Sequence, residues 1–260
     1  MRKVLTRALL FAVMITMSTI AMAQNTHDGA LTLTPAVVTL RGTYGQSTTQ
    51  RLTLTNGTSR DLTFDLFARD VIVRDGKRIF VEPGEVGGSI AATAVFSRNR
   101  ITLKAGESSS VNVTLTMPAN TQSRAVVALF RTTEPIRNGT KSVVPAVGTL
   151  LTFRLSDNLA ADASPVTVWP QSSTSNASFE QTYINVGKEP LIAKGVVAIL
   201  DAKGALVGKS SMAAHRLLPS ERVRMTSEYA GELAPGKYRV VVTVDVEGQT
   251  VTRDAEMLVR

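Results

Sequence analysis

Apolar and polar residues alternate along much of the chain after residue 30, and this period of two is typical of β-strands with one buried face. Residues 111–117 show the pattern most clearly, because Val, Val, Leu and Met alternate there with Asn and Thr. In the second half, valines alternate over residues 240–246, and the Glu247-Gly248 turn leads into a returning strand. Neither half shows a long amphipathic helix. The pattern therefore predicts an all-β protein built from two β-sandwiches.

Residues 123–156 depart from this alternation. Ala125–Phe130 is a continuous apolar run, too short to span a membrane, and it predicts a strand buried on both faces. Residues 143–155 resemble a second strand, and the Pro and Asn-Gly between the two predict a turn region, so we expect a long β-hairpin. An antiparallel sheet normally exposes one face to water. A neighbouring domain or a partner protein is therefore expected to cover the second face of the first strand.

Two further segments carry local signals. In residues 62–73 the apolar positions change parity partway, which predicts a β-bulge or bend near Leu66 and Phe67. Asp75-Gly76 lies between two apolar runs and is a strong signal for a two-residue hairpin turn. Both features are expected inside the first sandwich.

The first 23 residues have the pattern of an export signal. A basic start precedes the apolar run Ala8–Ile20, and Ala21-Met22-Ala23 provides a small-x-small cleavage site. A retained membrane anchor is the alternative, but the apolar run is shorter than a bilayer requires. We expect export, cleavage before Gln24, and no stable membrane insertion afterwards.

A second boundary is expected at residues 157–165. This segment is small and polar and ends in proline, which is typical of an interdomain linker. It separates a first domain, residues 24–156, from a second domain, residues 166–260. Together they are long enough for two ordinary domains, each with its own core.

The composition excludes several classes of function. The 29 Lys and Arg outnumber the 21 Asp and Glu, and removal of Arg2, Lys3 and Arg7 with the signal leaves 26 basic residues and a formal charge of +5. Basic residues do not cluster with aromatic residues, so nucleic-acid binding is not expected. The chain contains no Cys, which excludes disulfides, thiolate metal sites and cysteine nucleophiles.

Few residues offer catalytic chemistry. The two histidines, His27 and His215, are isolated and have no metal-ligand spacing. Residues 204–210 resemble a phosphate-binding loop, but only three residues separate the glycines where the motif needs four, and no helix pattern follows. The aspartates of residues 61–75, Asp70 among them, are expected on a solvated face and in a turn. We therefore expect a non-enzymatic protein that binds no metal, nucleotide or other cofactor.

Four segments together resemble the periplasmic pilus-assembly chaperones, the PapD-like family. They are Leu33–Val38, Gln50–Gly57, Ile101–Glu107 and Phe130–Pro135, and they occur in order across about residues 30–156. The resemblance implies two immunoglobulin-like β-sandwich domains set at an angle, and a periplasmic location. It also implies that an edge strand of domain one is offered to an incomplete pilin subunit.

The resemblance also assigns residues that would anchor a client. The family holds its client's terminal carboxylate with an Arg and a Lys, at positions that are Val37 and Thr152 in this chain. Neither residue can pair with a carboxylate. Arg41 and Arg154 are therefore the candidates for a relocated anchor.

The strand-pairing residues of the family correspond to Val143, Pro145 and Val147. They share one parity with later apolar positions that are expected in the core, so a bend at Gly148 is expected between the available end and the buried end. Pro145 donates no main-chain hydrogen bond, which fits an edge strand. The alternative is that this is simply an edge strand, which Pro145 and Lys141 protect against aggregation.

The residues and the resemblance together predict an exported, periplasmic protein that binds a pilin-like subunit or another envelope protein. Strand addition would provide main-chain hydrogen bonds, while alternate side-chain pockets would select the partner. One alternative is a structural or adhesive cell-surface module without chaperone activity, similar to the WxL-interacting proteins of Gram-positive cell walls. An exported hydrolase built on distant Asp and Glu residues is a third possibility.

Overall fold

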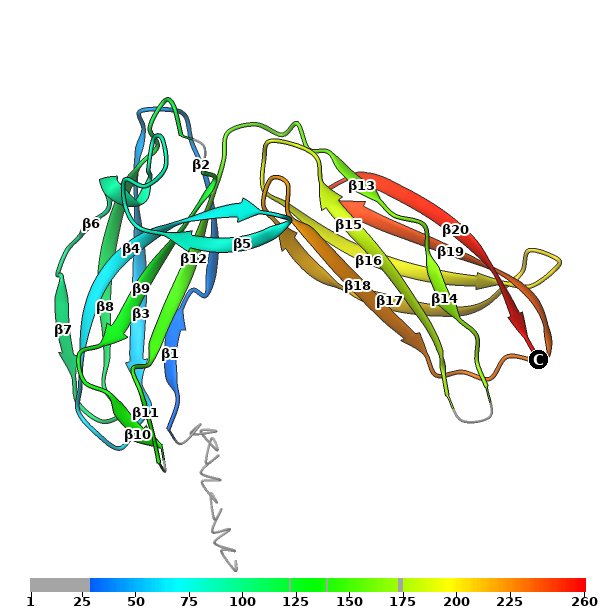
Figure 1. Ribbon diagram of the computed structural model, residues 1–260, viewed down its shortest axis with the longest axis horizontal. Helices are drawn as coiled ribbons and strands as arrows, with labels where there is room; N and C mark the ends of the chain where they lie inside the picture. The colour runs from blue at the N-terminus through cyan, green and yellow to red at the C-terminus, as the bar shows by residue number, and fades with distance from the viewer. Residues whose placement is uncertain (1–28, 122, 139, 173–174) are drawn as a thin grey trace, which may run out of the picture.

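The computed structural model describes residues 29–121, 123–138, 140–172 and 175–260, so the predicted signal peptide lies outside the described residues. Strands dominate these residues, and the helix among them is a short 3-10 turn, η1 (Ala91–Thr93). The all-β prediction is confirmed (Figure 1). The strands are β1 (Leu31–Thr34), β2 (Val37–Arg41), β3 (Ser47–Asn56), β4 (Leu62–Arg74), β5 (Lys77–Val81), β6 (Val95–Phe96), β7 (Arg100–Leu103), β8 (Ser108–Thr116), β9 (Ala125–Thr132), β10 (Ile136–Asn138), β11 (Lys141–Val143), β12 (Ala146–Arg154), β13 (Ala161–Ala163), β14 (Thr167–Trp169), β15 (Ala177–Asn185), β16 (Leu191–Leu200), β17 (Leu206–Leu217), β18 (Arg222–Tyr229), β19 (Gly236–Val246) and β20 (Gln249–Val259).

Two sheets form the first sandwich. One has the strand order β1-β3-β8-β6, and the other has the order β2-β12-β9-β4-β5, with β7 also paired to β4. β1 and β2 are consecutive in the chain but belong to different sheets, so the start of the chain ties the two layers together. The inward side chains of both sheets form the first core, whose fully buried members include Leu52, Phe64, Leu115, Phe130 and Leu151.

The second sandwich follows the same plan. β15 pairs with β13, β14 and β18 in one sheet, and the other sheet has the order β17-β16-β19-β20. The predicted valine row of residues 240–246 is buried in the second core between these sheets. The prediction of two immunoglobulin-like sandwiches is confirmed, and Figure 1 shows their long directions inclined to one another.

The interval between the two cores is shorter than the predicted linker, residues 157–165. Leu159 and Ala163 are buried in the second core, and β13 lies inside the predicted linker and pairs with β15. The reason is that Leu159, Ala161 and Ala163 face the second core at alternate positions, while Asp162 between the two alanines is exposed. A small and polar composition is thus compatible with a short edge strand as well as with a linker.

β9 is buried on both faces, as its unbroken apolar sequence predicts. Val126 and Phe130 face the first core. Ala125 and Val127 face the opposite side, where Leu218 of the second sandwich packs on them. A neighbouring domain therefore covers part of the outer face of this strand.

β4 is continuous, so the predicted bulge near Leu66 and Phe67 is wrong. Its pairing with β9 runs without a register shift. The apolar parity changes because the outer face of β4 is also covered. The guanidinium carbons of Arg69 and Arg131 lie 5.5 and 5.0 Å from the centroid of the Phe67 ring, which fits cation–π contacts.

The hairpin of β4 and β5 connects the two sandwiches. Its turn is the predicted Asp75-Gly76 pair, whose φ angles are 52° and 76°, and Figure 1 shows the hairpin reaching towards the second sandwich. The Arg222 main-chain N–H donates a hydrogen bond to the Gly76 carbonyl oxygen (3.0 Å), and Arg78 Nε lies 2.7 Å from Glu221 Oε1. The hairpin is therefore a direct structural link between the domains.

A second set of contacts crosses the junction where the chain leaves β12. Arg154 Nη1 lies 2.9 Å from Glu247 Oε1. The Leu155 N–H and the Ser156 hydroxyl donate hydrogen bonds to the two carboxylate oxygens of Glu189, at 2.9 and 3.3 Å. Polar contacts at two separate places thus hold the two sandwiches in their relative orientation.

Gly148 in β12 permits the close approach of side chains from β9. A Cβ atom at this position would lie 2.7 Å from Val127 Cγ2 and 2.9 Å from Leu129 Cδ2. We expect Gly148→Ala to lower the free energy of unfolding by about 1–3 kcal/mol, measured by urea denaturation. Gly236→Ala is the matched control, because a Cβ atom there would meet no atom closer than 3.9 Å. Equal losses in both variants would contradict this account of Gly148.

Candidate functional site: the open edge of β12 and the interdomain cleft

β12 is paired along one side but only partly along the other. β9 pairs with Ala146–Thr152, whereas β2 pairs only with Leu150–Arg154. The Phe153 N–H donates to Arg124 in the direction of β9 (2.8 Å), and the Leu150 N–H donates to Ala36 on the opposite side (3.0 Å). Because these directions alternate along a strand, the main-chain N–H and C=O groups of the even-numbered residues of β12 point away from β9.

This alternation defines the open edge, residues 146–148. The N–H and C=O groups of Ala146 and Gly148 point away from β9, at positions where no described strand pairs with them. Val147, between them, pairs with Phe130 of β9 and packs against the first core. The open edge therefore presents main-chain groups on a strand whose other side is paired with β9.

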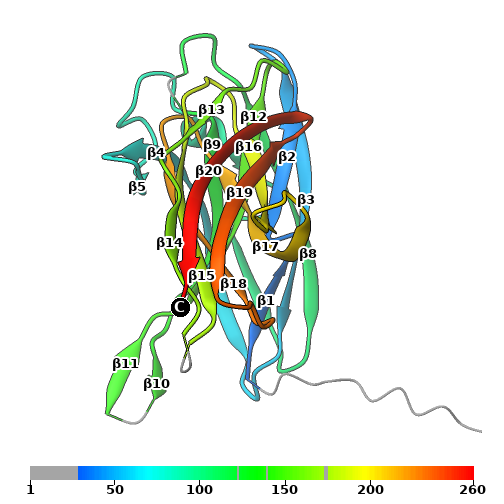
Figure 2. The ribbon, with the colours of Figure 1, turned by 90° about the vertical axis from the view of Figure 1, so that its right-hand side faces the viewer.

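The predicted second strand, residues 143–155, is divided in the structure. β11 pairs with β10 in a separate two-stranded sheet, and Figure 2 shows this hairpin extending beyond the end of the first sandwich. Pro145 lies between β11 and β12, and its carbonyl oxygen accepts the Thr132 N–H (3.0 Å). Because Pro145 has no N–H to continue the ladder, Val143 and Val147 belong to different strands rather than to one row.

Apolar side chains precede the open edge. Val143 and Val144 are 51% and 47% exposed. At the other end of the edge, the Thr149 hydroxyl donates a hydrogen bond to the Pro35 carbonyl oxygen (2.6 Å), where β2 begins to cover the strand. The open edge is thus bounded by two exposed valines at one end and by the start of β2 at the other.

The two positions where the resemblance expects anchoring cations lie close together. Val37 of β2 is half exposed and pairs with Leu150. Thr152 is buried, pairs with Thr39, and donates a hydrogen bond from its hydroxyl to the Val38 carbonyl oxygen (3.1 Å). Neither side chain carries a charge, so a cation at this place must come from elsewhere.

Arg41 and Arg154, the candidates for a relocated anchor, are both paired with carboxylates of this chain. Arg154 is buried and contacts Glu247 (2.9 Å) and Asp157 (3.1 Å). Arg41 is exposed and lies 3.1 Å from the same Asp157. The hydrogen bond from Arg41 holds the pKa of Asp157 below its ordinary value, and the charge of Arg154 adds to this effect.

Arg216 of β17 brings a cation to this place from the second sandwich. Its Nη1 donates hydrogen bonds to the hydroxyls of Thr39 (2.5 Å) and Thr152 (3.3 Å). Sequence reasoning missed it because 177 residues separate Arg216 from Thr39. No local pattern around Arg216 indicates the contact, which depends on how the two sandwiches dock.

A cleft of about 470 Å³ lies between the sandwiches beside Arg216. Val37 and Leu150 line it from the first sandwich. The other lining side chains are mostly basic and come from the β4–β5 hairpin and from the second sandwich. They include Lys77, Arg78, His215, Arg216 and Arg222.

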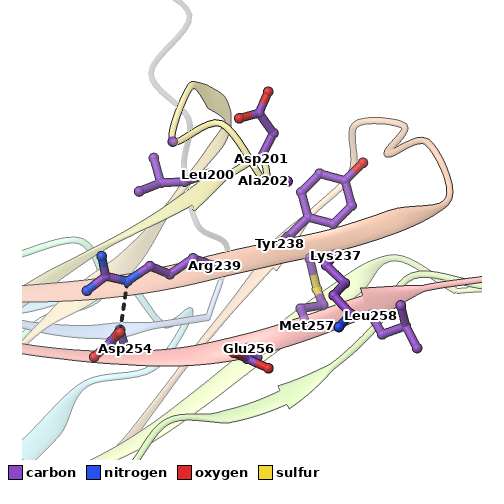
Figure 3. A pocket seen from close by; sticks show the side chains of 11 residues that line it. Leu200, Asp201, Ala202, Lys237, Tyr238, Arg239, Asp254, Glu256, Met257 and Leu258 are labelled. Carbon is purple, nitrogen blue, oxygen red and sulfur yellow. Dashed lines mark hydrogen bonds and ion pairs between the residues drawn. The ribbon is translucent and has the colours of Figure 1, made fainter.

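A second hollow, of about 610 Å³, lies at the far end of the second sandwich (Figure 3). Charges of both signs line it, and Arg239 Nε is 2.8 Å from Asp254 Oδ2. Tyr238 donates a hydrogen bond from its hydroxyl to the Ala234 carbonyl oxygen (2.6 Å). This mixed lining favours no single class of ligand.

Metal-ligand clusters and membrane-spanning helices are both absent from the described residues. No group of His, Asp and Glu side chains within them is arranged to hold a metal ion. Within the same residues, no helix has the length and hydropathy needed to cross a membrane.

Comparisons with known proteins give structural likenesses only. No family model and no curated protein matches the chain. Similar solved structures include a chaperone–tip adhesin complex of CFA/I fimbriae (14% identity, 88% of this chain, 98% of that chain, TM-score 0.46) and the class 5 fimbrial chaperone CfaA (14%, 88%, 98%, 0.45). Another is the E. coli chaperone DraB (12%, 88%, 99%, 0.42).

Proposed function

We propose that this protein is a periplasmic binding protein that holds an incomplete pilin-like subunit, or another envelope protein, by strand pairing at the open edge of β12. The observation that carries this proposal is the edge itself. One side of residues 146–148 is fully paired with β9, while the other side meets no described strand. Unpaired main-chain groups at a sheet edge are a template for an added strand.

The proposed partner is an immunoglobulin-like domain that lacks one strand. Such a domain exposes a hydrophobic groove between the two strands that would normally flank the missing one, and an added strand can complete it. Val143 and Val144 supply exposed apolar side chains next to the open edge. The edge would supply the main-chain hydrogen bonds.

We propose a non-enzymatic role. The features that distinguish the open edge are main-chain groups and aliphatic side chains. These groups select a partner strand by hydrogen bonding and apolar contact, whereas bond cleavage needs a nucleophile or an acid–base pair. The periplasmic location rests on the export signal predicted for residues 1–23.

Threonine substitutions test the apolar part of the proposed site. We expect the double variant Val143→Thr, Val144→Thr to capture an incomplete pilin subunit about tenfold less tightly, because Thr keeps β-propensity but fills an apolar groove poorly. Thermal stability should stay nearly unchanged, because both side chains are about half exposed. The measurement is co-elution of the protein with a pilin subunit refolded without its donor strand.

Val95→Thr is the matched control for this experiment. Val95 is 66% exposed but lies on β6, in the opposite sheet of the first sandwich. Capture by this variant should equal that of the unchanged protein. Loss of stability with capture intact in the double variant would place these valines in a structural role. Absence of capture by any form would favour a structural or adhesive module.

A further inference from the structure

The single tryptophan of the chain lies on the outer face of the second sandwich. Trp169 belongs to β14 and is 48% exposed. The preceding residue, Val168, packs against the second core. Because successive side chains of a strand point to opposite faces, Trp169 points away from that core. Within the described part of the chain its indole N–H donates no hydrogen bond. A large side chain with an apolar ring and a polar N–H is thus accessible to a partner.

Trp169 is part of a row of three residues that crosses the sheet. It pairs with Ser178 of β15, and Ser178 pairs on its other side with Glu228 of β18. Residues that oppose each other in antiparallel strands place their side chains on the same face. Because adjacent strands are about 4.8 Å apart, roughly 10 Å separates the Cα atoms of Trp169 and Glu228. In this Trp169 row, a small serine side chain therefore lies between two larger ones.

Carboxylates give the surroundings of the Trp169 row a negative charge. Glu228 is exposed and forms no ion pair among the described residues. Glu180 follows Ser178 by two positions on the same face of β15, and its carboxylate lies 3.7 Å from Arg224 Nε. The other arginine of β18, Arg222, is six residues from Glu228, or roughly 20 Å along the strand. One arginine thus accompanies two carboxylates near Trp169, which leaves an excess of negative charge.

A guanidinium group is the protein side chain that suits this arrangement best. The face of an indole ring attracts cations more strongly than any other aromatic side chain does. A carboxylate forms paired, charge-assisted hydrogen bonds with a guanidinium group. Because the guanidinium group is planar, it can stack on the ring of Trp169 while its N–H groups donate to Glu228. The indole and the carboxylate therefore favour the same class of ligand.

We propose that the Trp169 row is a second docking surface, which binds an arginine side chain in a basic segment of another envelope protein. This inference goes beyond the proposed function, because the row lies on the second sandwich and the open edge lies on the first. The chemistry of the two surfaces also differs. Main-chain groups and valines at the open edge favour an apolar strand, whereas the Trp169 row favours a cation. We expect the two surfaces to bind their partners independently.

The single tryptophan is also a probe for the experiment that tests this proposal. Three labelled peptides share capped ends and Gly-Ser flanks, which do not favour strand pairing. Their central residue is arginine, lysine or citrulline, the uncharged analogue of arginine. We expect the arginine peptide to shift the emission of Trp169 and to bind about tenfold more tightly than the citrulline peptide. The lysine peptide should bind with intermediate affinity, because an ammonium group lacks the planar fork. Fluorescence anisotropy on the full chain measures each affinity.

Variants of the row locate the binding. Glu228→Gln should weaken binding of the arginine peptide about fivefold and leave binding of the citrulline peptide unchanged. Trp169→Ala should weaken binding of the arginine peptide to a similar extent, and Trp169→Phe should restore part of it. Glu256→Gln is the matched control, because it removes an exposed carboxylate from β20, in the other sheet of the same sandwich. Its affinity for the arginine peptide should equal that of the unchanged protein.

The other outcomes would overturn the proposal. Equal affinity for the arginine and citrulline peptides excludes a cation site. An arginine preference that survives both Glu228→Gln and Trp169→Ala places the cation elsewhere on the chain. If a neutral disaccharide shifts the emission of Trp169 and the arginine peptide does not, the row binds a glycan rather than a basic protein. Capture of an incomplete pilin subunit by Glu228→Gln should equal that of the unchanged protein, and weaker capture would contradict the independence of the two surfaces.

Discussion

Replacing Asp70 with alanine is expected to lower the free energy of unfolding by about 3–5 kcal/mol. Asp70 is fully buried in the first sandwich, although it lies on a strand. Its Oδ1 accepts the N–H groups of Ile90 and Ala91, at 3.0 and 3.1 Å, and its Oδ2 accepts the Ser89 hydroxyl. Alanine would leave three buried donors without an acceptor, and each such group costs about 1–3 kcal/mol.

The consequence extends beyond these three hydrogen bonds because Asp70 positions η1. The first N–H groups of this 3-10 turn point at the carboxylate, and Thr93 in the same turn exchanges hydrogen bonds with Thr116 of β8 (2.9 and 3.0 Å). Asp70 therefore connects one sheet of the sandwich to the other through η1. Asp70→Asn should lose less stability than Asp70→Ala, because it keeps one acceptor oxygen.

Urea denaturation of the full chain measures this effect. Asp65→Ala is the matched control on the same strand. Asp65 pairs with Arg100 (2.7 Å), and solvent screens this ion pair, so its loss should change the free energy of unfolding little. Similar losses for Asp65→Ala and Asp70→Ala would contradict the role assigned to the buried carboxylate.

A proline at position 146 is expected to reduce capture of an incomplete pilin subunit tenfold or more, the largest functional effect of a single change. The Ala146 N–H points away from β9 at the open edge, so its removal leaves the ladder with β9 intact. It also removes one hydrogen bond to an added strand and places a ring where that strand would approach. A loss of about 1.4 kcal/mol in binding corresponds to this tenfold change.

Ala146→Thr is the control for the proline variant, because it adds a side chain of similar size and keeps the N–H group. Capture by this variant should stay within about twofold of the unchanged protein, and both variants should unfold at nearly the same temperature. Full capture by Ala146→Pro would contradict strand pairing at the open edge.

Much of the fold could be predicted from the sequence because its signals are local. The alternating residues 111–116 lie in β8, residues 240–246 lie in β19, and Asp75-Gly76 is the turn between β4 and β5. The continuous apolar run of β9 correctly indicated two buried faces. In each case a short pattern determines which faces are buried, and the structure needs no information from distant residues.

The errors arise where distant residues decide burial. The sequence places Asp70 on a solvated face. In the structure its carboxylate is buried, because the N–H groups at the start of η1, about 20 residues later in the chain, donate hydrogen bonds to it. The bulge near Phe67 was expected because one face of β4 was assumed to meet water, whereas Arg69 and Arg131 cover the ring. Residues 157–165 contain β13 because β15 provides a strand to pair with.

The candidate site could be predicted in part. Sequence reasoning proposed strand pairing at Val143, Pro145 and Val147, and the open edge contains Val147 and begins next to Pro145. Partner binding at these residues stays a prediction. Sequence reasoning did not separate Val143 into β11, because that division depends on pairing with β10. It also could not find Arg216, whose position beside Thr152 results from the docking of two separately folded sheets.

Hydrogen exchange at the Gly148 main-chain N–H tests strand pairing most directly. We would measure the full chain alone and with a pilin subunit refolded without its donor strand. The Phe153 N–H, which already donates to Arg124 (2.8 Å), is the internal reference and should be protected in both states. The open edge predicts that Gly148 exchanges rapidly in the free protein and becomes strongly protected in the complex. A stable complex in which Gly148 exchanges as rapidly as in the free protein would contradict it.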